Sequence, residues 1–516
     1  MLPCVLLEDA HLLVVNKPTG INTHAPTPYA GEGIYELLRH REPRWAKLAI
    51  IHRLDKEVSG VLVFSKTPLA NRSLTRQFTS GKVRKSYVLL TDRKPGRKEF
   101  TVKTCLVRVG DRYVSRPLHA GGHVAETLFR FPGGAQASRL TYEVVEAQPL
   151  TGRTHQIRVH AAANGFPILG DALYGGTPAR RVYLHAAELA LRHPATGKEI
   201  TFRVQVDFDA DPRSGLRAAV VEPELTDAYR LIHGASDGWP SWYVDRLGKY
   251  LVSQSAGRLS QAEADELGRL MERCSAHGAY HKLLTRQMQR ASPSETTPAL
   301  VLGETPPERF TIQENGLQFE LSLSQGHSTG LFLDQRDNRR RLLTGHIAAG
   351  FPLFQLEIGN RKSELLNAFA YTCGFSVCAA KAGAHTTNLD LSRVYLEWGK
   401  RNFALNHIPP ADHEFIYGDV FDWLRRLAKK GRRFDVILLD GELLGAALPL
   451  LRGGGVLFAS TNAADWPPEK FLAAVEEAIR AGKRKVVQRH YVPQPSDFPV
   501  SRSEPAYLKT VWLRIE

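Results

Sequence analysis

The chain has 516 residues, and its hydrophobic content of 43% and charged content of 23% are ordinary for a globular protein of about three domains. Its formal net charge of +15 favours a polyanionic partner, such as RNA, DNA or an anionic membrane surface. The five cysteines form no CxxC pair and their odd number argues against a closed disulfide framework, so we expect a reducing, cytoplasmic location. No run approaches the roughly 20 apolar residues of a membrane-spanning helix.

The first part of the chain mixes short strand patterns with one clear helix pattern. A helix is expected over 68–78, which begins with a proline and repeats apolar residues at helical spacing. Strands are expected over 12–15, 61–64, 86–90 and 140–145. We therefore predict an α+β domain with a mixed, mainly antiparallel sheet over 1–212, followed by a polar linker over 213–225.

The second part of the chain, over 226–516, has a different pattern of predicted strands and helices. A small α+β domain is expected over 226–320, with a helix near 260–274, and strand and helix patterns then alternate over 321–516. The expected strands are 365–369, 386–390, 415–418, 436–440 and 456–460, and the expected helices are 375–382, 392–406 and 420–429. Such alternation predicts a doubly wound, Rossmann-like sheet, so the fold class is multidomain α/β.

Two motifs in the first part carry the strongest functional signal. Residues 52–66 read HRLDKEVSGVLVFSK and place Asp55 between two cations, just before a strand. Residues 152–160 read GRTHQIRVH and supply two arginines. An aspartate kept ionised by a facing arginine, in a site that admits RNA, suits attack on a nucleoside. Each motif alone is weak, since a surface Arg–Asp pair stabilises little and GRTHQIRVH could be one basic edge strand.

Two further motifs make the pattern specific. These are KSY at 85–87 and GFPILGDALYG at 165–175. In this order and spacing, the four motifs closely resemble the RluA-type pseudouridine synthases over about residues 5–210. The resemblance implies an enzyme that breaks the glycosidic bond of uridine, turns the base and rejoins it through carbon, with no metal and no cofactor.

The resemblance also assigns roles to individual residues. Asp55 would be the catalytic aspartate, Arg158 its ion-pair partner, and Tyr87 would pack on the target base. Arg53 would occupy the gap that the flipped base leaves. Arg153 is the less favoured partner for Asp55, and a phosphate contact suits it equally.

Other basic residues lie close to these motifs. Lys85 belongs to a basic edge that would hold RNA phosphate, although a solvated face is the alternative. His52, His155 and His160 have the chemistry of acid–base catalysts. The pseudouridine synthases require no histidine, so we expect all three imidazoles to serve as structural hydrogen-bonding groups.

The last part resembles class I S-adenosylmethionine-dependent rRNA methyltransferases of the RlmI/RlmK kind over about 226–516. The segment LLNAFAYTCGF at 365–375 matches their strand-to-helix cofactor turn, and LDQRDN at 333–338 matches a signature that borders the cofactor. The resemblance implies that S-adenosylmethionine would be bound by Gln335, Asn367, Phe369, Tyr371, Thr372, Gly374, Asp390, Asp419 and Asp440. Among these, Gly374 would let the backbone approach the methionine moiety and Asp390 would accept hydrogen bonds from the ribose.

The segment after Asp440 departs from this family's pattern. Relatives carry Asp-Pro-Pro-Phe or a close variant there, whereas no proline pair follows Asp440, and thirteen residues separate it from Gly454, where we expect the next strand. A parallel crossover needs about a dozen residues, so the sheet can close but little chain remains for a target-base pocket. The ASTN sequence at 459–462 lacks the cysteine of 5-methylcytidine-forming relatives, which excludes their covalent mechanism. We expect a cofactor-binding fold whose own catalysis is in doubt.

The sequence thus predicts an RNA-modification enzyme that makes pseudouridine in structured rRNA or tRNA and carries a methyltransferase-like module. One alternative is that the methyltransferase is the working part and the synthase fold docks RNA. The intact Asp55 motif and the short segment after Asp440 disfavour it. The other is a non-catalytic RNA-binding or ribosome-assembly factor, which would gain nothing from a carboxylate facing phosphates.

Overall fold

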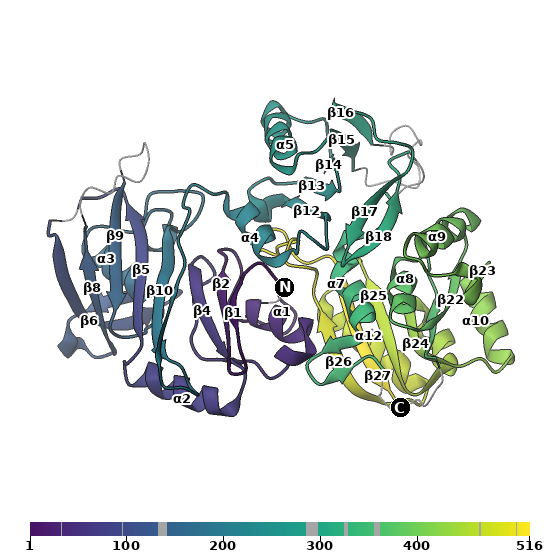
Figure 1. Cartoon of the computed structure of the whole chain (residues 1–516), viewed down its shortest axis with the longest axis horizontal. Helices are drawn as coiled ribbons and strands as arrows, with labels where there is room; N and C mark the ends of the chain where they lie inside the picture. The colour runs from purple at the N-terminus through teal and green to yellow at the C-terminus, as the bar shows by residue number, and fades with distance from the viewer. Residues whose placement is uncertain are drawn as a thin grey trace. The chain divides into compact units, whose positions relative to one another are not determined.

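The chain folds into two compact units, as seen in this computed structural model (Figure 1). The structure describes all residues except 32, 95, 133–141, 285–297, 325–328, 355–361, 464–465 and 502. The first unit comprises Met1–Ala25, Gly33–Leu37 and Lys47–Glu222, and the second comprises Pro26–Glu32, Leu38–Ala46 and Pro223–Glu516. Among the described residues, no helix is long and apolar enough to span a membrane.

One large sheet forms the body of the first unit. Its strands run in the order β1-β2-β4-β10-β5-β9-β8-β6-β7, with β3 paired to β4 and β11 paired to β10. Every pairing is antiparallel except that of β10 with β4, which confirms the mixed, mainly antiparallel sheet. The strands are β1 (Val5–Glu8), β2 (Leu12–Lys17), β3 (Ala49–Ile50), β4 (Ser59–Ser65), β5 (Arg84–Thr91), β6 (Glu99–Val109), β7 (Arg112–Arg116), β8 (His123–Arg130), β9 (Glu143–Pro149), β10 (Leu184–Arg192) and β11 (Glu199–Arg203). The strand expected over 140–145 lies partly outside the described residues.

The helices of the N-terminal region are α1 (Ile34–Arg41), α2 (Pro68–Thr79), α3 (Gln156–Ala163) and α4 (Pro212–Val220). Helix α2 starts where the sequence predicts, because the Thr67 side chain accepts the amide hydrogen of Ala70 and proline fits the first turn. Helix α4 occupies part of the segment expected to be a linker. The edge-strand alternative for the GRTHQIRVH motif is wrong, because its second half forms helix α3.

A small sheet with one covering helix opens the C-terminal part of the second unit. Its strand order is β12-β13-β14-β15-β16, and only β14 and β15 pair in parallel. Its helix α5 (Gln261–Cys274) begins with a capping box between Ser260 and Glu263. The strands are β12 (Ala228–His233), β13 (Trp242–Leu247), β14 (Tyr250–Ser255), β15 (Gly278–Leu283) and β16 (Ala299–Gly303), and the hairpins β17 (Phe310–Glu314) with β18 (Leu317–Leu321) and β19 (His346–Ala348) with β20 (Phe351–Pro352) follow.

The remainder is a sheet of order β23-β22-β21-β24-β25-β27-β26. Strands β23 to β25 are parallel and the last two pairings are antiparallel. The strands are β21 (Glu364–Asn367), β22 (His385–Asp390), β23 (Glu414–Tyr417), β24 (Phe434–Asp440), β25 (Leu451–Thr461), β26 (Val486–Val492) and β27 (Lys509–Ile515). The helices are α7 (Arg336–Thr344), α8 (Gly374–Lys381), α9 (Arg393–Leu405), α10 (Val420–Lys429), α11 (Leu444–Ala447) and α12 (Pro468–Ala481). The doubly wound sheet is therefore confirmed.

Both faces of this sheet are covered, as Figure 1 shows. Neighbouring residues on a strand point to opposite faces. Leu365 accordingly packs with α8 and α9, and Leu366 packs with α10, α11 and α12. The chain runs from β21 through β22 to β23 and then crosses back to β24 on the other side of β21, so the strand order reverses beside β21. In open α/β sheets a ligand site lies at such a switch point, outside the carboxyl ends of the strands.

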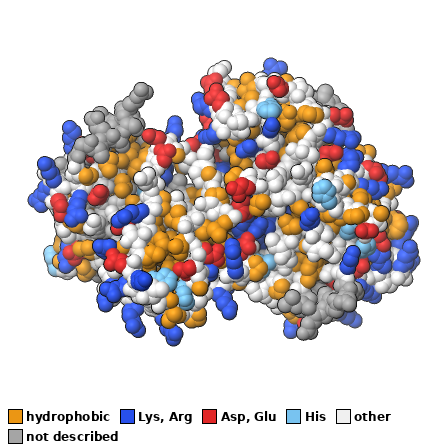
Figure 2. All heavy atoms as spheres, viewed as in Figure 1, with side chains coloured by type: hydrophobic (Ala, Val, Ile, Leu, Met, Phe, Trp, Pro, Cys, Tyr) orange, Lys and Arg blue, Asp and Glu red, His pale blue; other side chains and the backbone are white. Residues whose placement is uncertain are grey.

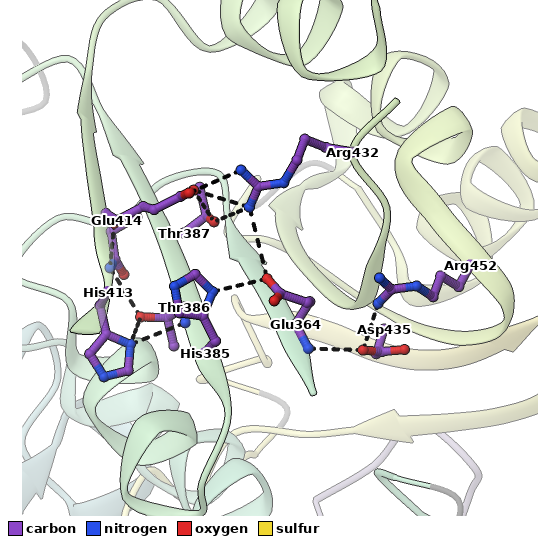
Figure 3. Close-up of polar contacts among 10 residues, drawn as sticks. Glu364, His385, Thr386, Thr387, His413, Glu414, Arg432, Asp435 and Arg452 are labelled. Carbon is purple, nitrogen blue, oxygen red and sulfur yellow. Dashed lines mark hydrogen bonds and ion pairs between the residues drawn. The ribbon is translucent and has the colours of Figure 1, made fainter. Parts of the chain in front are cut away.

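The opposite, amino-terminal edge of the sheet carries a network of charged groups (Figure 3). His385 Nδ1 lies 2.9 Å from Glu364 Oε2, which joins the starts of β22 and β21. Arg432 donates to both carboxylate oxygens of Glu414, at 3.0 and 3.1 Å, and lies 3.8 Å from Glu364. These contacts join the starts of three strands and leave the carboxyl edge for a ligand.

Candidate active sites

The first site is a cavity of about 1020 Å³ in the first unit. Its walls come from five places in the chain, which are the segment after β2, the loop before β4, the region from α2 to β5, the segment from the end of β9 into α3, and the first residue of β10. All six residues predicted for pseudouridylation line this cavity, and they are Arg53, Asp55, Lys85, Tyr87, Arg153 and Arg158. The structure therefore brings together side chains that lie up to about a hundred residues apart in the sequence.

Arg158 makes the ion pair that the motifs predict. Its Nη1 lies 3.2 Å from Asp55 Oδ2. It also makes two shorter hydrogen bonds to Asp171, from Nε to Oδ2 at 2.7 Å and from Nη2 to Oδ1 at 2.8 Å. Only 4% of the Arg158 side chain and 1% of the Asp171 side chain are exposed. Burial lowers the pKa of Arg158, but the hydrogen bonds and charge of Asp171 outweigh burial and raise it.

Asp171 is a site residue that the sequence analysis missed. It lies in the GFPILGDALYG motif, which was recognised without a role for the aspartate. Because both Asp171 oxygens bind Arg158, the guanidinium has a fixed plane, and its remaining nitrogen faces Asp55. Asp171 therefore orients the arginine rather than the RNA.

The loop that carries Asp55 is held by the last residue of β2 and by the segment that follows it. The Lys17 ammonium is fully buried and donates to the carbonyls of Ile21 at 2.8 Å and Lys56 at 3.4 Å. Thr23 Oγ1 donates to the Leu54 carbonyl at 2.8 Å. Burial lowers the pKa of Lys17 to about 7, although the charge of Asp55 opposes this shift. These bonds fix the backbone on either side of Asp55.

Tyr87 and Lys85 stand on the same face of β5, because they are two residues apart. Burial raises the pKa of Tyr87 and the charge of Asp55 raises it further, so its phenol stays protonated. Burial lowers the pKa of Lys85, whose ammonium lies 5.6 Å from the Phe78 ring. Arg153 is exposed and donates from Nε to the Val124 carbonyl at 3.1 Å, so Arg158 rather than Arg153 pairs with Asp55.

The three histidines near the motifs differ in their surroundings. His52 Nε2 accepts the amide hydrogen of Val63, and burial lowers its pKa to about 3. The His160 ring lies between the hydroxyls of Thr104 and Thr127, and burial lowers its pKa to about 4. Both imidazoles are thus neutral structural groups. His155 instead has Nε2 3.7 Å from Asp55 Oδ2.

The second site lies at the carboxyl edge of the doubly wound sheet. Asn367 ends β21, Asp390 ends β22 and Asp440 ends β24, while Asp419 follows β23. Because these strands are parallel, their carboxyl ends meet along one edge. Asp419 and Asp440 are exposed there.

Asp390 organises the turn between β21 and α8. Its Oδ2 accepts the amide hydrogen of Tyr371 at 2.8 Å and its Oδ1 accepts that of Ser392 at 2.8 Å. Tyr371 and Cys373 both have a left-handed backbone, with φ of 48° and 61°, so the chain turns sharply before α8. Each Asp390 oxygen keeps a second lone pair, which a ribose hydroxyl can use.

Three of the residues predicted to bind the cofactor are buried parts of the scaffold. Asn367 donates to Ser376 Oγ at 2.9 Å and Thr372 donates to the Gly330 carbonyl. Gln335 Oε1 accepts from an asparagine at 2.8 Å. These amides and hydroxyl hold the turn and the signature segment in place.

Gly374 has a packing reason to be glycine. A Cβ atom there would lie 2.8 Å from Leu331 Cδ1 and 3.4 Å from Arg339 Cδ. Real Cβ atoms do not approach another carbon so closely, so a larger residue would require the end of the Leu331 side chain to shift. Close packing of the helix therefore accounts for this glycine.

Apolar side chains are exposed at the same edge. Phe369, Leu391 and Tyr417, which follow or end adjacent strands, are 49%, 64% and 49% exposed. Phe332 is also exposed and lies 5.3 Å from the Tyr371 ring. A nucleoside needs an apolar floor for its base and an acceptor for its ribose hydroxyls. These side chains and Asp390 supply both, so the residues present fit S-adenosylmethionine.

The segment after Asp440 packs into the core. A short 3-10 helix and α11 follow Asp440, and β25 begins at Leu451 rather than at Gly454. The expected start of this strand was therefore wrong by three residues. Leu444, Ala447 and Leu448 are buried among the sheet and its helices, so they cover the sheet instead of lining a pocket for a base.

Comparison with known proteins gives separate matches for the two parts of the chain. Residues 11–163 match the RNA pseudouridylate synthase family, and residues 229–447 match the S-adenosylmethionine-dependent methyltransferase family. The ribosomal RNA large subunit methyltransferase of Deinococcus radiodurans is 32% identical over 318 residues, which cover 56% of this chain and 73% of that protein.

Two further similar proteins were found, one by sequence and one among solved structures. Ribosomal RNA large subunit methyltransferase I of Aeromonas salmonicida is 32% identical over 323 residues, which cover 58% of this chain and 77% of that protein. Among solved structures, human RNA Pseudouridylate Synthase Domain Containing 4 is 26% identical, with a TM-score of 0.32, and covers 40% of this chain and 89% of its own.

Proposed function

Because the chain belongs to the family of large-subunit ribosomal RNA methyltransferases and also carries an RNA pseudouridylate synthase domain, we propose that it isomerises uridine to pseudouridine in structured RNA. Ribosomal RNA is the proposed substrate class, because the relatives of the second part are named for it. The observation that carries the proposal is Asp55, which lies 3.2 Å from Arg158 in a cavity large enough for a flipped nucleotide.

In the proposed reaction the Asp55 carboxylate attacks the target nucleoside. The bond between N1 of uracil and C1′ of the ribose breaks, the base turns within the cavity, and a bond between C5 and C1′ forms. The hydrogen of C5 leaves as a proton, and N1, freed from the ribose, takes up a proton from solvent, so product and substrate are isomers. Tyr87, whose phenol is protonated, would form a wall of the cavity against the free base. Arg53, which is exposed at the rim of the cavity, would occupy the gap that the flipped base leaves in the RNA stack.

Positive charge supports RNA as the partner. Arg53, Lys85 and Arg153 line the cavity beside the catalytic group, where phosphate contacts would hold the strand. Lys and Arg side chains are scattered over the face drawn in Figure 2, among acidic and apolar ones. The formal net charge of +15 gives the long-range attraction that brings a polyanion to such a surface.

For the second unit we propose S-adenosylmethionine binding at the carboxyl edge of the sheet. Asp390 would accept from the ribose hydroxyls, and Phe369 and Leu391 would cover the adenosine. The bound cofactor would supply an electrophilic methyl group. The packed segment after Asp440 leaves little room for a target base, so we propose that this unit binds the cofactor and contributes little methyl transfer.

The first test measures tritium release from RNA that is labelled at C5 of uridine, with wild type and Asp55→Asn. The label leaves only when the ring rejoins through C5, so we expect release by the wild type and a loss of about 10³-fold or more in the variant. The variant keeps the size of the side chain and one acceptor oxygen for Arg158, so RNA affinity should change less than about twofold.

The outcome also separates the alternatives. If Asp55→Asn released tritium like the wild type, the proposed catalytic role of Asp55 would be wrong. If the variant instead lost RNA affinity, and the wild type released no tritium from rRNA or tRNA, a non-catalytic RNA-binding factor would be the better reading. Methyl transfer to rRNA without tritium release would favour the synthase fold as a docking domain.

A further inference from the structure

His155 has a strained backbone beside the proposed catalytic carboxylate. Its φ of 56° and ψ of 16° place it in the left-handed region, immediately before α3. Residues other than glycine adopt this conformation rarely, and they gather at functional sites, where surrounding contacts must support the strain. The His155 ring packs edge-on against the rings of Tyr113 and Tyr174, with centroids 5.8 and 5.7 Å away.

The next residue supplies that support. Gln156 Oε1 accepts from the Arg153 amide at 3.0 Å and from Thr151 Oγ1 at 2.6 Å. Its Nε2 donates to the Glu126 carbonyl at 2.8 Å and to Thr127 Oγ1 at 2.9 Å. Gln156 is buried, so these four bonds fix the loop and with it the direction of the His155 side chain.

The contacts also favour one ring nitrogen as the carrier of the proton. The Tyr174 hydroxyl oxygen accepts the Tyr113 amide hydrogen at 3.0 Å and lies 2.8 Å from His155 Nδ1. The other nitrogen, Nε2, faces Asp55 Oδ2 at 3.7 Å. A carboxylate can only accept, so the proton belongs on Nε2. Nδ1 then accepts the hydroxyl hydrogen of Tyr174. Burial lowers the pKa of His155, which favours this neutral form.

We propose that His155, set in its tautomer by Tyr174, is a positioning residue for Asp55, a role that rests on the proposed pseudouridylation. Both His155 Nε2 and Arg158 Nη1 face the same oxygen, Asp55 Oδ2. With both donors on the side of Oδ2, Oδ1 would be the oxygen that meets the nucleoside. A neutral N–H can orient the carboxylate without neutralising its charge, which an imidazolium would do.

The 3.7 Å separation fits a hydrogen bond that forms when RNA binds. Donor–acceptor pairs in catalytic sites are often long before the substrate arrives and shorten in the complex. A movement of less than 1 Å brings His155 Nε2 within about 3 Å of Asp55 Oδ2. The arrangement of hydroxyl, imidazole and carboxylate resembles the way a third group orients a histidine in other enzymes.

Two substitutions at His155 form a matched pair. The amide nitrogen of glutamine can reach the place of Nε2, whereas that of asparagine reaches only the place of Nδ1. His155→Asn should lower kcat for tritium release by about 10²-fold, because a misplaced catalytic group has an effect of that order. His155→Gln should restore activity to within about fivefold of the wild type, and KM should stay within about twofold for both variants. A merely structural role predicts no advantage for glutamine, because asparagine adopts the left-handed backbone of His155 more readily.

The pH dependence of kcat in the variant Tyr174→Phe tests the assigned tautomer of His155. Removal of the hydroxyl frees the Nδ1 lone pair, so the pKa of His155 should rise towards its ordinary value of 6.5. The protonated ring would then neutralise Asp55, and the acid limb of the kcat profile should move to higher pH than in the wild type. A profile that keeps its acid limb in place would overturn the proposal.

A measurement that does not depend on catalysis tests the role of His155 separately from the proposed function. Nitrogen-15 NMR of the full chain, labelled at histidine and assigned by comparison with His155→Gln, reports which ring nitrogen is protonated. We expect the Nε2–H tautomer in the wild type. An Nδ1–H tautomer would overturn the positioning role even if the wild type releases tritium. No tritium release by a wild type that shows the Nε2–H tautomer would instead overturn both the proposed function and the role that rests on it.

Discussion

A single buried aspartate holds the first site in order. Asp171 makes two hydrogen bonds to Arg158, and only the third guanidinium nitrogen faces Asp55. Such a buried pair contributes little net stability compared with apolar residues, but the loss of one partner leaves an uncompensated charge. The site therefore depends on Asp171 for both the position and the burial of its arginine.

We expect Asp171→Asn to lower the free energy of unfolding of the first unit by about 3 kcal/mol, because Arg158 keeps its charge and loses its buried counter-ion. Urea unfolding of the full chain, followed through the transition of that unit, measures the change. The matched control is Glu57→Gln, since Glu57 lies 3.6 Å from the same arginine but is 46% exposed. It should change stability by less than about 1 kcal/mol. Equal effects of the two substitutions would contradict the assigned role of Asp171.

At the scale of elements, the two edges of the doubly wound sheet have different tasks. The carboxyl edge carries Asp390 and the exposed apolar side chains of the candidate cofactor site. The amino-terminal edge carries ion pairs that join the starts of neighbouring strands (Figure 3). A shift in register moves every residue of a strand, so contacts that fix the start of a strand also fix the position of its carboxyl end.

The pH dependence of one such contact can be worked out. Burial raises the pKa of Glu414, but hydrogen bonds from Arg432 and Thr387 outweigh burial and hold it below its ordinary value of 4.5. A carboxyl group with a lowered folded-state pKa stabilises the protein above pH 4.5 and loses this contribution as the pH falls through the folded value.

Arg432→Ala should therefore lower the free energy of unfolding of the second unit by about 0.5 kcal/mol at pH 7, since the pair is partly exposed. The difference between wild type and variant should shrink below pH 4.5, as Glu414 becomes protonated. Denaturant unfolding of both proteins at several pH values measures this difference in the free energy of unfolding. A difference that stays constant down to pH 3 would mean that the ion pair is not its source.

At the scale of the whole molecule, two catalytic folds share one basic chain. Each unit has its own core and its own site, so each should respond separately to its own ligand. Thermal unfolding of such a chain is not expected to follow one two-state transition.

S-adenosylmethionine should raise the midpoint of one thermal transition and leave the other in place. At a concentration one hundred times Kd the bound unit would gain about 2.7 kcal/mol. Asp390→Ala should abolish the shift, because the carboxylate holds the turn and faces the proposed ribose. The control Asp412→Ala removes an exposed carboxylate outside the site and should keep the shift. A shift that survives Asp390→Ala would contradict the proposed cofactor site.

By itself, the sequence determined both families, the fold class and the local elements. Motifs such as HRLD indicate a chemistry that needs fixed residue types at short spacing. The periodicity of apolar residues indicates whether a segment is a strand or a helix and which of its faces is buried. Helix α2 begins where its threonine cap and proline place it, and the ion pair between Asp55 and Arg158 matches the motif-based prediction.

Only the tertiary structure decided which distant side chains meet. It brought Asp171 to Arg158, turned His155 towards Asp55, and made Asn367 and Thr372 parts of the scaffold. Periodicity could not place these contacts, because they depend on strand register and on the direction of a side chain after a strained turn. The start of β25 was missed for a similar reason, since its first residues pair with β24 across a glycine-rich segment that reads locally as a turn.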